Sequence, residues 1–86
     1  MPKISEFFGI KIIIQFREHG APHFHAIYGD EEASIGIHPL TVLAGHLNNR
    51  ALGMVMEWAA LHNKELIQAW NDTQTGKLPQ KIEPLQ

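Results

Sequence analysis

Three of the six histidines of this chain lie within seven residues, at His19, His23 and His25. Imidazole is the side chain whose unperturbed pKa lies closest to neutrality, so a group of histidines can hold a metal ion, transfer protons or bind phosphate. Arg17 precedes the group and offers a positive charge for a phosphate oxygen. No other stretch of the sequence concentrates such side chains, so residues 17–25 are the candidate site of chemistry.

The spacing leaves three interpretations open. In the first, His19, His23 and His25 supply three nitrogen ligands to a divalent metal such as zinc, and water fills a further position. In the second, which needs no metal, one histidine is a general base and another a general acid, while Arg17 or Lys11 stabilises a phosphate, as in a metal-independent ribonuclease. In the third, the histidines only pack and form hydrogen bonds. Whether the protein is an enzyme stays open at this point.

The histidines must be positioned by the backbone around them. An extended conformation is expected at His23 and His25, because aromatic and β-branched residues surround them. Residues two apart in a strand point to the same side, which puts both rings on one face. His19 precedes the segment Gly20-Ala21-Pro22, which suits a turn, and we expect this third ring to fold back toward the pair.

Length and composition limit the class of protein. Eighty-six residues predict one domain, residues 1–86, with a modest core and a shallow site. Seven Lys and Arg against nine Asp and Glu give a net charge of −2, which does not support binding along nucleic acid, although a local basic patch is compatible with it. Without cysteine, disulfides and thiolate zinc sites are excluded. No signal peptide or membrane-spanning stretch is evident, so we expect a cytoplasmic protein with no membrane partner.

Alternation of apolar and polar residues predicts three antiparallel strands, over residues 10–17, 23–28 and 31–37. Gly29-Asp30 is suited to the hairpin turn between the last two. Residues 40–43 add a short fourth strand. Apolar positions alternate with polar ones in these strands, as expected for a sheet with one buried face.

The two histidines of the second strand are expected on the polar face of this sheet. Phe24, Ala26 and Tyr28 fit the apolar side, so His23 and His25 point the other way, into water. The opposite assignment would bury two imidazoles that then need hydrogen-bond partners. The expected polar face also contains Lys11, Gln15, Arg17, Glu32 and Ser34.

After an expected loop at residues 45–49, the period changes to three and four residues. It predicts one helix from residue 50 to about residue 73, with Asn48 or Asn49 as its N-cap, packed across the sheet. Its apolar face consists of Leu52, Val55, Ala59, His62, Leu66 and Ala69. His62 is a candidate fourth metal ligand, but its place on this face argues against that role. The expected fold is α+β, a three- to four-stranded antiparallel sheet covered by one long C-terminal helix.

Met54, Trp58 and Leu61 form a second apolar strip on this helix, wider than one sheet face requires. Two alternatives explain the strip. The tail, residues 77–86, folds back over it, or another chain covers it. A homodimer through this helix or through an unpaired sheet edge is consistent with the second alternative.

Four separated segments carry a resemblance to a known family. In chain order they are Pro2–Ile10, Pro22–His25 with Tyr28-Gly29, Glu57–Ala59 with Leu61-His62, and Lys81–Leu85. Together they span nearly the whole chain and resemble the bacterial domain of unknown function 4160 (DUF4160). The family name itself supplies no reaction.

The resemblance implies a small bacterial protein of the cytosol, encoded beside a second small protein in an arrangement like a toxin–antitoxin operon. It implies a cognate antitoxin-like partner and a toxin-like role for this chain. The catalytic candidates of the effector surface are then His23 and His25, assisted by His19 and Arg17. The alternative is a non-catalytic regulatory or protein-interaction module, with or without a bound metal.

Overall fold

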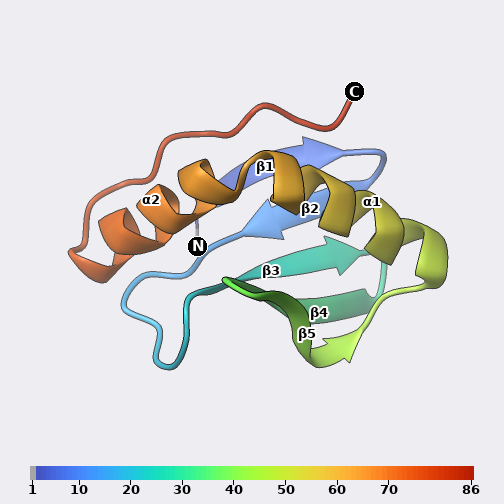
Figure 1. Cartoon of the computed structure of the whole chain (residues 1–86), viewed down its shortest axis with the longest axis horizontal. Coiled ribbons are helices and arrows are strands. Elements are labelled where there is room, and N and C mark those ends of the chain that lie inside the picture. The colour runs from blue at the N-terminus through green and yellow to red at the C-terminus, as the bar shows by residue number, and fades with distance from the viewer. Residues whose placement is uncertain (1) are drawn as a thin grey trace.

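The computed structural model describes residues 2–86. Five strands joined in chain order form one antiparallel sheet, and two helices and an extended tail follow (Figure 1). The elements are β1 (Lys3–Phe7), β2 (Ile10–Ile13), β3 (His23–Tyr28), β4 (Glu31–Ile37), β5 (Leu40–His46), α1 (Asn49–Leu61) and α2 (Asn63–Gln74). The predicted α+β class is confirmed, and two of its details differ.

The first difference is the number of strands, which is five and not three or four. The sequence prediction missed β1, which pairs with β2 through a tight turn whose residues Phe8 and Gly9 both have positive φ. It also placed Gly45 and His46 in a loop, whereas β5 continues through both. A bulge opposite β4 and a φ of +79° at Gly45 interrupt the alternation there, so the period of a strand is lost in the sequence.

The second difference is in the helix. The predicted single helix is two helices that meet at His62, whose φ of −116° and ψ of 28° are not helical. The His62 N–H donates to the Trp58 carbonyl, and the His62 carbonyl accepts from the Leu66 N–H, so hydrogen bonding continues across the break. Because the apolar period is also preserved, the sequence does not reveal the break. The predicted N-cap is confirmed, since Asn48 Oδ1 accepts from the Ala51 N–H at 3.0 Å.

The core lies between the helices and one face of the sheet (Figure 1). Ile12, Ala26 and Ala33 pair across β2, β3 and β4, and directly paired residues of antiparallel strands point to the same side. All three are buried, and Trp58 of α1 packs on the same face. The Trp58 ring meets Phe24 edge to face at a centroid distance of 5.9 Å. The opposite face is therefore the one that carries the histidines of β3.

The tail covers part of the second apolar strip of α1. Trp58 is fully buried, and its Nε1–H donates to the Glu83 carbonyl at 2.8 Å. The Ile82 N–H donates to the Ile4 carbonyl at 2.8 Å, which fixes the tail alongside β1. Of the two alternatives, the tail and not another chain covers Trp58, whereas Leu61 remains 69% exposed. Neither of the described helices is long and apolar enough to cross a membrane.

Candidate functional site

His23 and His25 share one face of the sheet, opposite to the face of the core residues Phe24 and Ala26. His25 pairs with Ile13 of β2 and with Ser34 of β4, so its side chain points opposite to the core residues on either side of it. The His23 and His25 rings lie 5.2 Å apart between centroids, nearly perpendicular to each other at 78°. The alternation in the sequence therefore predicted both the common face and the proximity of the rings.

The expectation that these rings point into water is wrong. His23 and His25 are only 8% and 9% exposed. The Trp70 ring of α2 lies 5.1 Å from the His23 ring, and the carboxylate of Glu18 contacts both histidines. The predicted strand 10–17 ends at Ile13, and the chain then passes into the loop that carries Glu18 to the rings.

Glu18 is the member of the site that the sequence prediction missed. Its carboxylate Oε2 lies 3.0 Å from Nε2 of His23, and its Oε1 lies 3.0 Å from Nε2 of His25. The loop is tied to α2, because the Glu18 carbonyl accepts from Gln74 Nε2 at 3.0 Å. A signal was present in the sequence, since Glu18 is an acidic neighbour of the histidine group. Spacing alone does not determine whether Glu18 or the next residue faces β3.

The other nitrogen of each imidazole is also held. Nδ1 of His23 lies 2.8 Å from the Ala21 carbonyl oxygen, which can only accept, so this Nδ1 carries the hydrogen. Nδ1 of His25 lies 3.2 Å from the Ser34 hydroxyl. Each ring thus has Nδ1 anchored to the protein and Nε2 directed at the Glu18 carboxylate.

Two opposing effects act on the Glu18 carboxyl. Partial burial raises its pKa, whereas hydrogen bonds with His25 and His23, together with their charges, lower it. The net result is a pKa below the ordinary value of 4.5. Glu18 therefore carries its negative charge at neutral pH, directly beside two imidazole nitrogens.

Two of the predicted site residues are not brought into this group. The ring of His19 is exposed, and it is not among the grouped ligand atoms of the described residues. Arg17 has a φ of +50°, its N–H donates to the Thr73 carbonyl at 3.2 Å, and its guanidinium lies beside Gly76 after the end of α2. The loop therefore turns Glu18 toward His23 and His25 and leaves His19 exposed.

The remaining histidines lie elsewhere. His62 is at the break between the helices, where its Nδ1 lies 2.6 Å from a Glu65 carboxylate oxygen, so it is not a fourth ligand of this site. His38 is exposed. His46 is exposed too, but it lies in β5 and has a neighbour, because its Nε2 is 3.8 Å from Oε2 of Glu31.

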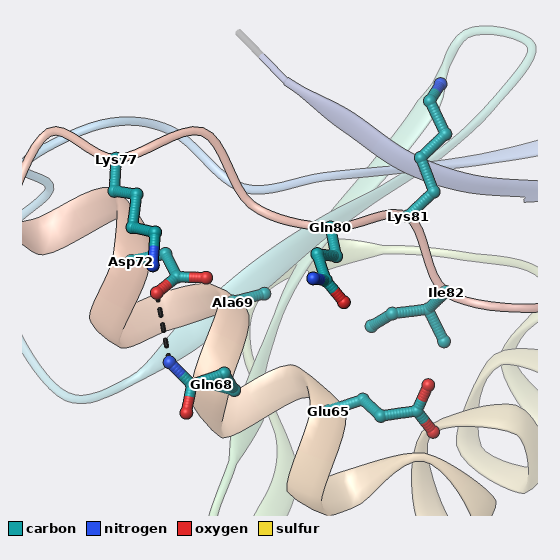
Figure 2. A pocket seen from close by; sticks show the side chains of 8 residues that line it. All are labelled: Glu65, Gln68, Ala69, Asp72, Lys77, Gln80, Lys81 and Ile82. Atoms are coloured by element: carbon teal, nitrogen blue, oxygen red, sulfur yellow. Dashed lines mark hydrogen bonds between the residues drawn. The ribbon is translucent and has the colours of Figure 1, made fainter.

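A separate hollow of about 310 Å³ lies between α2 and the tail (Figure 2). Buried Asp72 lines it and accepts a hydrogen bond from Gln68 Nε2 at 2.9 Å, and the Lys77 side chain points toward the same carboxylate (Figure 2). Charges of both signs face this hollow, and the Lys77 backbone N–H donates to the Asp72 carbonyl at 2.8 Å, which ties the start of the tail to the helix. The hollow does not contain the convergent histidines that distinguish the site at β3.

Comparison with known proteins gives one match. Residues 9–71 match the family described as Domain of unknown function (DUF4160). The matched span contains Glu18, His23 and His25, and it excludes both β1 and the tail. No curated protein and no solved structure matches the chain.

Proposed function

Because this chain belongs to the DUF4160 family, whose description names no activity, we propose a function from its site: the chain is the toxin-like effector half of a two-component pair. In this proposal it acts in the bacterial cytoplasm with a cognate antitoxin-like protein. Its functional centre is the group formed by Glu18, His23 and His25, hereafter the Glu18 cluster.

One observation supports this centre above all. Two imidazoles and a carboxylate present ligand atoms that all lie within 4.8 Å of one another, on side chains that are largely withdrawn from water. Removing polar and charged groups from water costs free energy, and apolar side chains would fill the same space without that cost. A carboxyl group whose pKa is shifted, as that of Glu18 is, and which contacts other ionisable side chains is typical of functional sites. The Glu18 cluster is therefore the part of the described surface that best fits an effector role.

The geometry also favours one of the mechanisms left open by the sequence. Nε2 of His23 and Nε2 of His25 both face Glu18 and are not free to exchange protons with a substrate. A metal-free acid–base pair of histidines thus fits less well than a centre in which the three groups act together. In this proposal Glu18 takes the place expected of His19, and Arg17 has no direct role.

Growth arrest on induced expression tests the proposal. We expect the wild-type protein to stop growth of a bacterial host, and Glu18→Gln and His23→Asn to abolish the arrest, because each removes one group of the cluster while keeping a similar shape. The matched control is His38→Asn, which alters an exposed histidine and should arrest growth as the wild type does. Backbone amide spectra of each purified variant establish that it folds.

The outcomes separate clearly. Equal arrest by wild-type protein and folded His23→Asn would remove the cluster from the mechanism. Failure of the wild-type protein to arrest growth, at a confirmed level of soluble protein, would overturn the effector role. Rescue of growth by the protein encoded next to this chain would support the antitoxin-like partner.

A regulatory or protein-interaction module is the second candidate. It is favoured by one observation, that every ring nitrogen of His23 and His25 already has a partner within the protein. Such a module would bind its partner equally well with or without the cluster, and would arrest nothing. Co-purification of the partner with the Glu18→Gln variant measures whether partner binding needs the cluster. Sedimentation of the purified protein detects a homodimer.

A further inference from the structure

We propose that the Glu18 cluster binds one divalent transition-metal ion of the zinc class, through Nε2 of His23, Nε2 of His25 and a carboxylate oxygen of Glu18. The inference deepens the function proposed for this site and rests on it for its biological role. Metal binding itself is measured on purified protein and does not depend on growth arrest.

The hydrogen bonding of His23 requires a cation at this position. Because the Ala21 carbonyl fixes the hydrogen on Nδ1, Nε2 of a neutral His23 ring is an acceptor. That nitrogen lies 3.0 Å from Oε2 of Glu18, which in its ionised form is an acceptor as well. Two acceptors at this separation repel each other unless a proton or a metal ion lies between them. A metal ion shared with His25 satisfies all three groups at once.

The separations of the ligand atoms fit such an ion. Zinc lies about 2.0–2.1 Å from imidazole nitrogen and carboxylate oxygen, so two tetrahedral ligands are about 3.3 Å apart. The Glu18 oxygens lie 3.0 Å from Nε2 of His23 and 3.0 Å from Nε2 of His25. All three ligand atoms lie within 4.8 Å of one another, so small shifts of the three side chains, of which Glu18 is the most exposed, admit the ion.

The surroundings orient the rings as metal ligands are oriented in proteins. A ligating histidine usually donates its second N–H to a carbonyl or carboxylate, and this contact fixes the tautomer and the plane of the ring. Here the Ala21 carbonyl at 2.8 Å plays that part for His23, and the Ser34 hydroxyl at 3.2 Å holds His25. Packing of Trp70 against His23 further restricts that ring.

The donor set indicates the class of metal. Two imidazoles and one carboxylate suit zinc and ferrous iron, whereas magnesium and calcium take oxygen ligands. Three protein ligands leave a coordination position for water or substrate, as in catalytic sites and unlike closed structural ones. The Glu18 side chain is 25% exposed, against 9% and 11% for the two histidine side chains, so this position faces solvent on the Glu18 side.

Titration of tag-free protein with zinc chloride tests the inference, by calorimetry for affinity and elemental analysis for stoichiometry. We expect one zinc per chain and a higher melting temperature with zinc, because a ligand that binds only the folded state stabilises it. Cobalt in place of zinc should give the visible absorption of a four- or five-coordinate site. Glu18→Gln and His23→Asn should weaken binding by at least about tenfold, since even outer groups of metal sites have effects of that size.

The controls are His19→Asn and His38→Asn, which remove exposed histidines and should bind zinc as the wild type does. Equal loss of affinity in His19→Asn would refute the ligand set. Folded wild-type protein that binds no zinc in molar excess, with the ¹⁵N shifts of an imidazolium at His23, would overturn the inference, because a proton would then occupy the place of the metal. Zinc binding without growth arrest supports the metal site and removes the effector role, whereas arrest without zinc binding does the reverse.

Discussion

Two buried hydroxyl groups of this small protein differ in whether they have a hydrogen-bond partner. Ser5 of β1 is buried, and its hydroxyl is the buried side-chain group among residues 2–86 for which no hydrogen-bond partner is found. Thr73 of α2 is fully buried too, but its hydroxyl donates to the Trp70 carbonyl at 2.8 Å. The two residues are a natural pair for comparing an unsatisfied and a satisfied hydroxyl.

Ser5→Ala is expected to leave the free energy of unfolding unchanged or to raise it by up to about 1 kcal/mol, because it removes a buried group that has lost its water. Thr73→Val keeps the shape of the side chain and removes a bonded hydroxyl, so it should lower the same quantity by about 1 kcal/mol. Urea unfolding of both variants measures the difference. Destabilisation by Ser5→Ala as large as that of Thr73→Val would contradict this view.

Two glycines, one in a strand and one in a helix, differ in the space available for a side chain. Gly45 in β5 has a φ of +79°, and a Cβ built there would lie 2.2 Å from the Glu32 carbonyl oxygen. Gly53 in α1 has open space at the same position. The strand therefore requires glycine at position 45, whereas the helix only tolerates it at position 53.

Gly45→Ala should therefore destabilise the protein by at least about 2 kcal/mol, through strain and displacement of the β4 backbone. Gly53→Ala should stabilise it by about 0.5–1 kcal/mol, because alanine loses less conformational freedom in a helix. Thermal and urea unfolding of the two variants provide the test. Similar effects of both substitutions would show that β5 does not need glycine at position 45.

The start of α1 is linked to β4 through a carboxylate. Glu31 Oε1 accepts from the Asn48 backbone N–H at 2.9 Å and from Asn48 Nδ2 at 3.1 Å. Both bonds lower the pKa of the Glu31 carboxyl below 4.5, and the bond from the Asn48 backbone has the larger effect. Burial opposes this shift by raising the pKa, and the charge of His46 lowers it further. The ionised carboxylate is thus the form that stabilises the fold.

Since its pKa is lower in the folded state, the contribution of Glu31 is complete above pH 4.5 and is lost as the pH falls through the folded value. Glu31→Gln should accordingly be less stable than the wild type at neutral pH, and the difference should shrink below pH 4.5. Glu57→Gln, an exposed change on α1, controls for the loss of a charge. If the stability difference between the wild type and Glu31→Gln were the same at neutral and acidic pH, the ionised Glu31 carboxylate would not be the stabilising form.

At the scale of the whole molecule, the tail completes the core. Ile82 is buried, its backbone is bonded to Ile4, and the Glu83 carbonyl accepts from Trp58. The tail joins the first strand and the first helix, two elements that are distant in the sequence (Figure 1). Its removal should therefore weaken the sheet edge and the helix together.

Deletion of residues 77–86 should lower the free energy of unfolding by at least about 2 kcal/mol, since burial of one isoleucine side chain contributes that order of stability. In a Trp70→Phe background Trp58 is the one remaining tryptophan, and its emission should shift to the red on deletion. The full-length Trp70→Phe protein is the control. Unchanged emission would mean that Trp58 is covered without the tail.

Features that depend on neighbouring residues could be predicted from the sequence alone. The bounds of β3 and β4, the Asn48 cap and the common face of His23 and His25 follow from side-chain alternation, turn residues and capping, which act over a few positions. The α+β class follows from the change of period between the strands and the helical region. These predictions needed no contact between distant parts of the chain.

Packing between distant elements determines which acid or imidazole lies in the candidate site. The loop after β2 turns Glu18 inward because its backbone is held by Gln74, 56 residues away, and by Thr73. Packing between distant segments also buries the rings that were expected in water and covers Trp58 with the tail. The break between the helices at His62 leaves the apolar period unchanged, so the sequence does not reveal it. Spacing along the chain fixes which residues can meet, and packing between distant elements fixes which of them do.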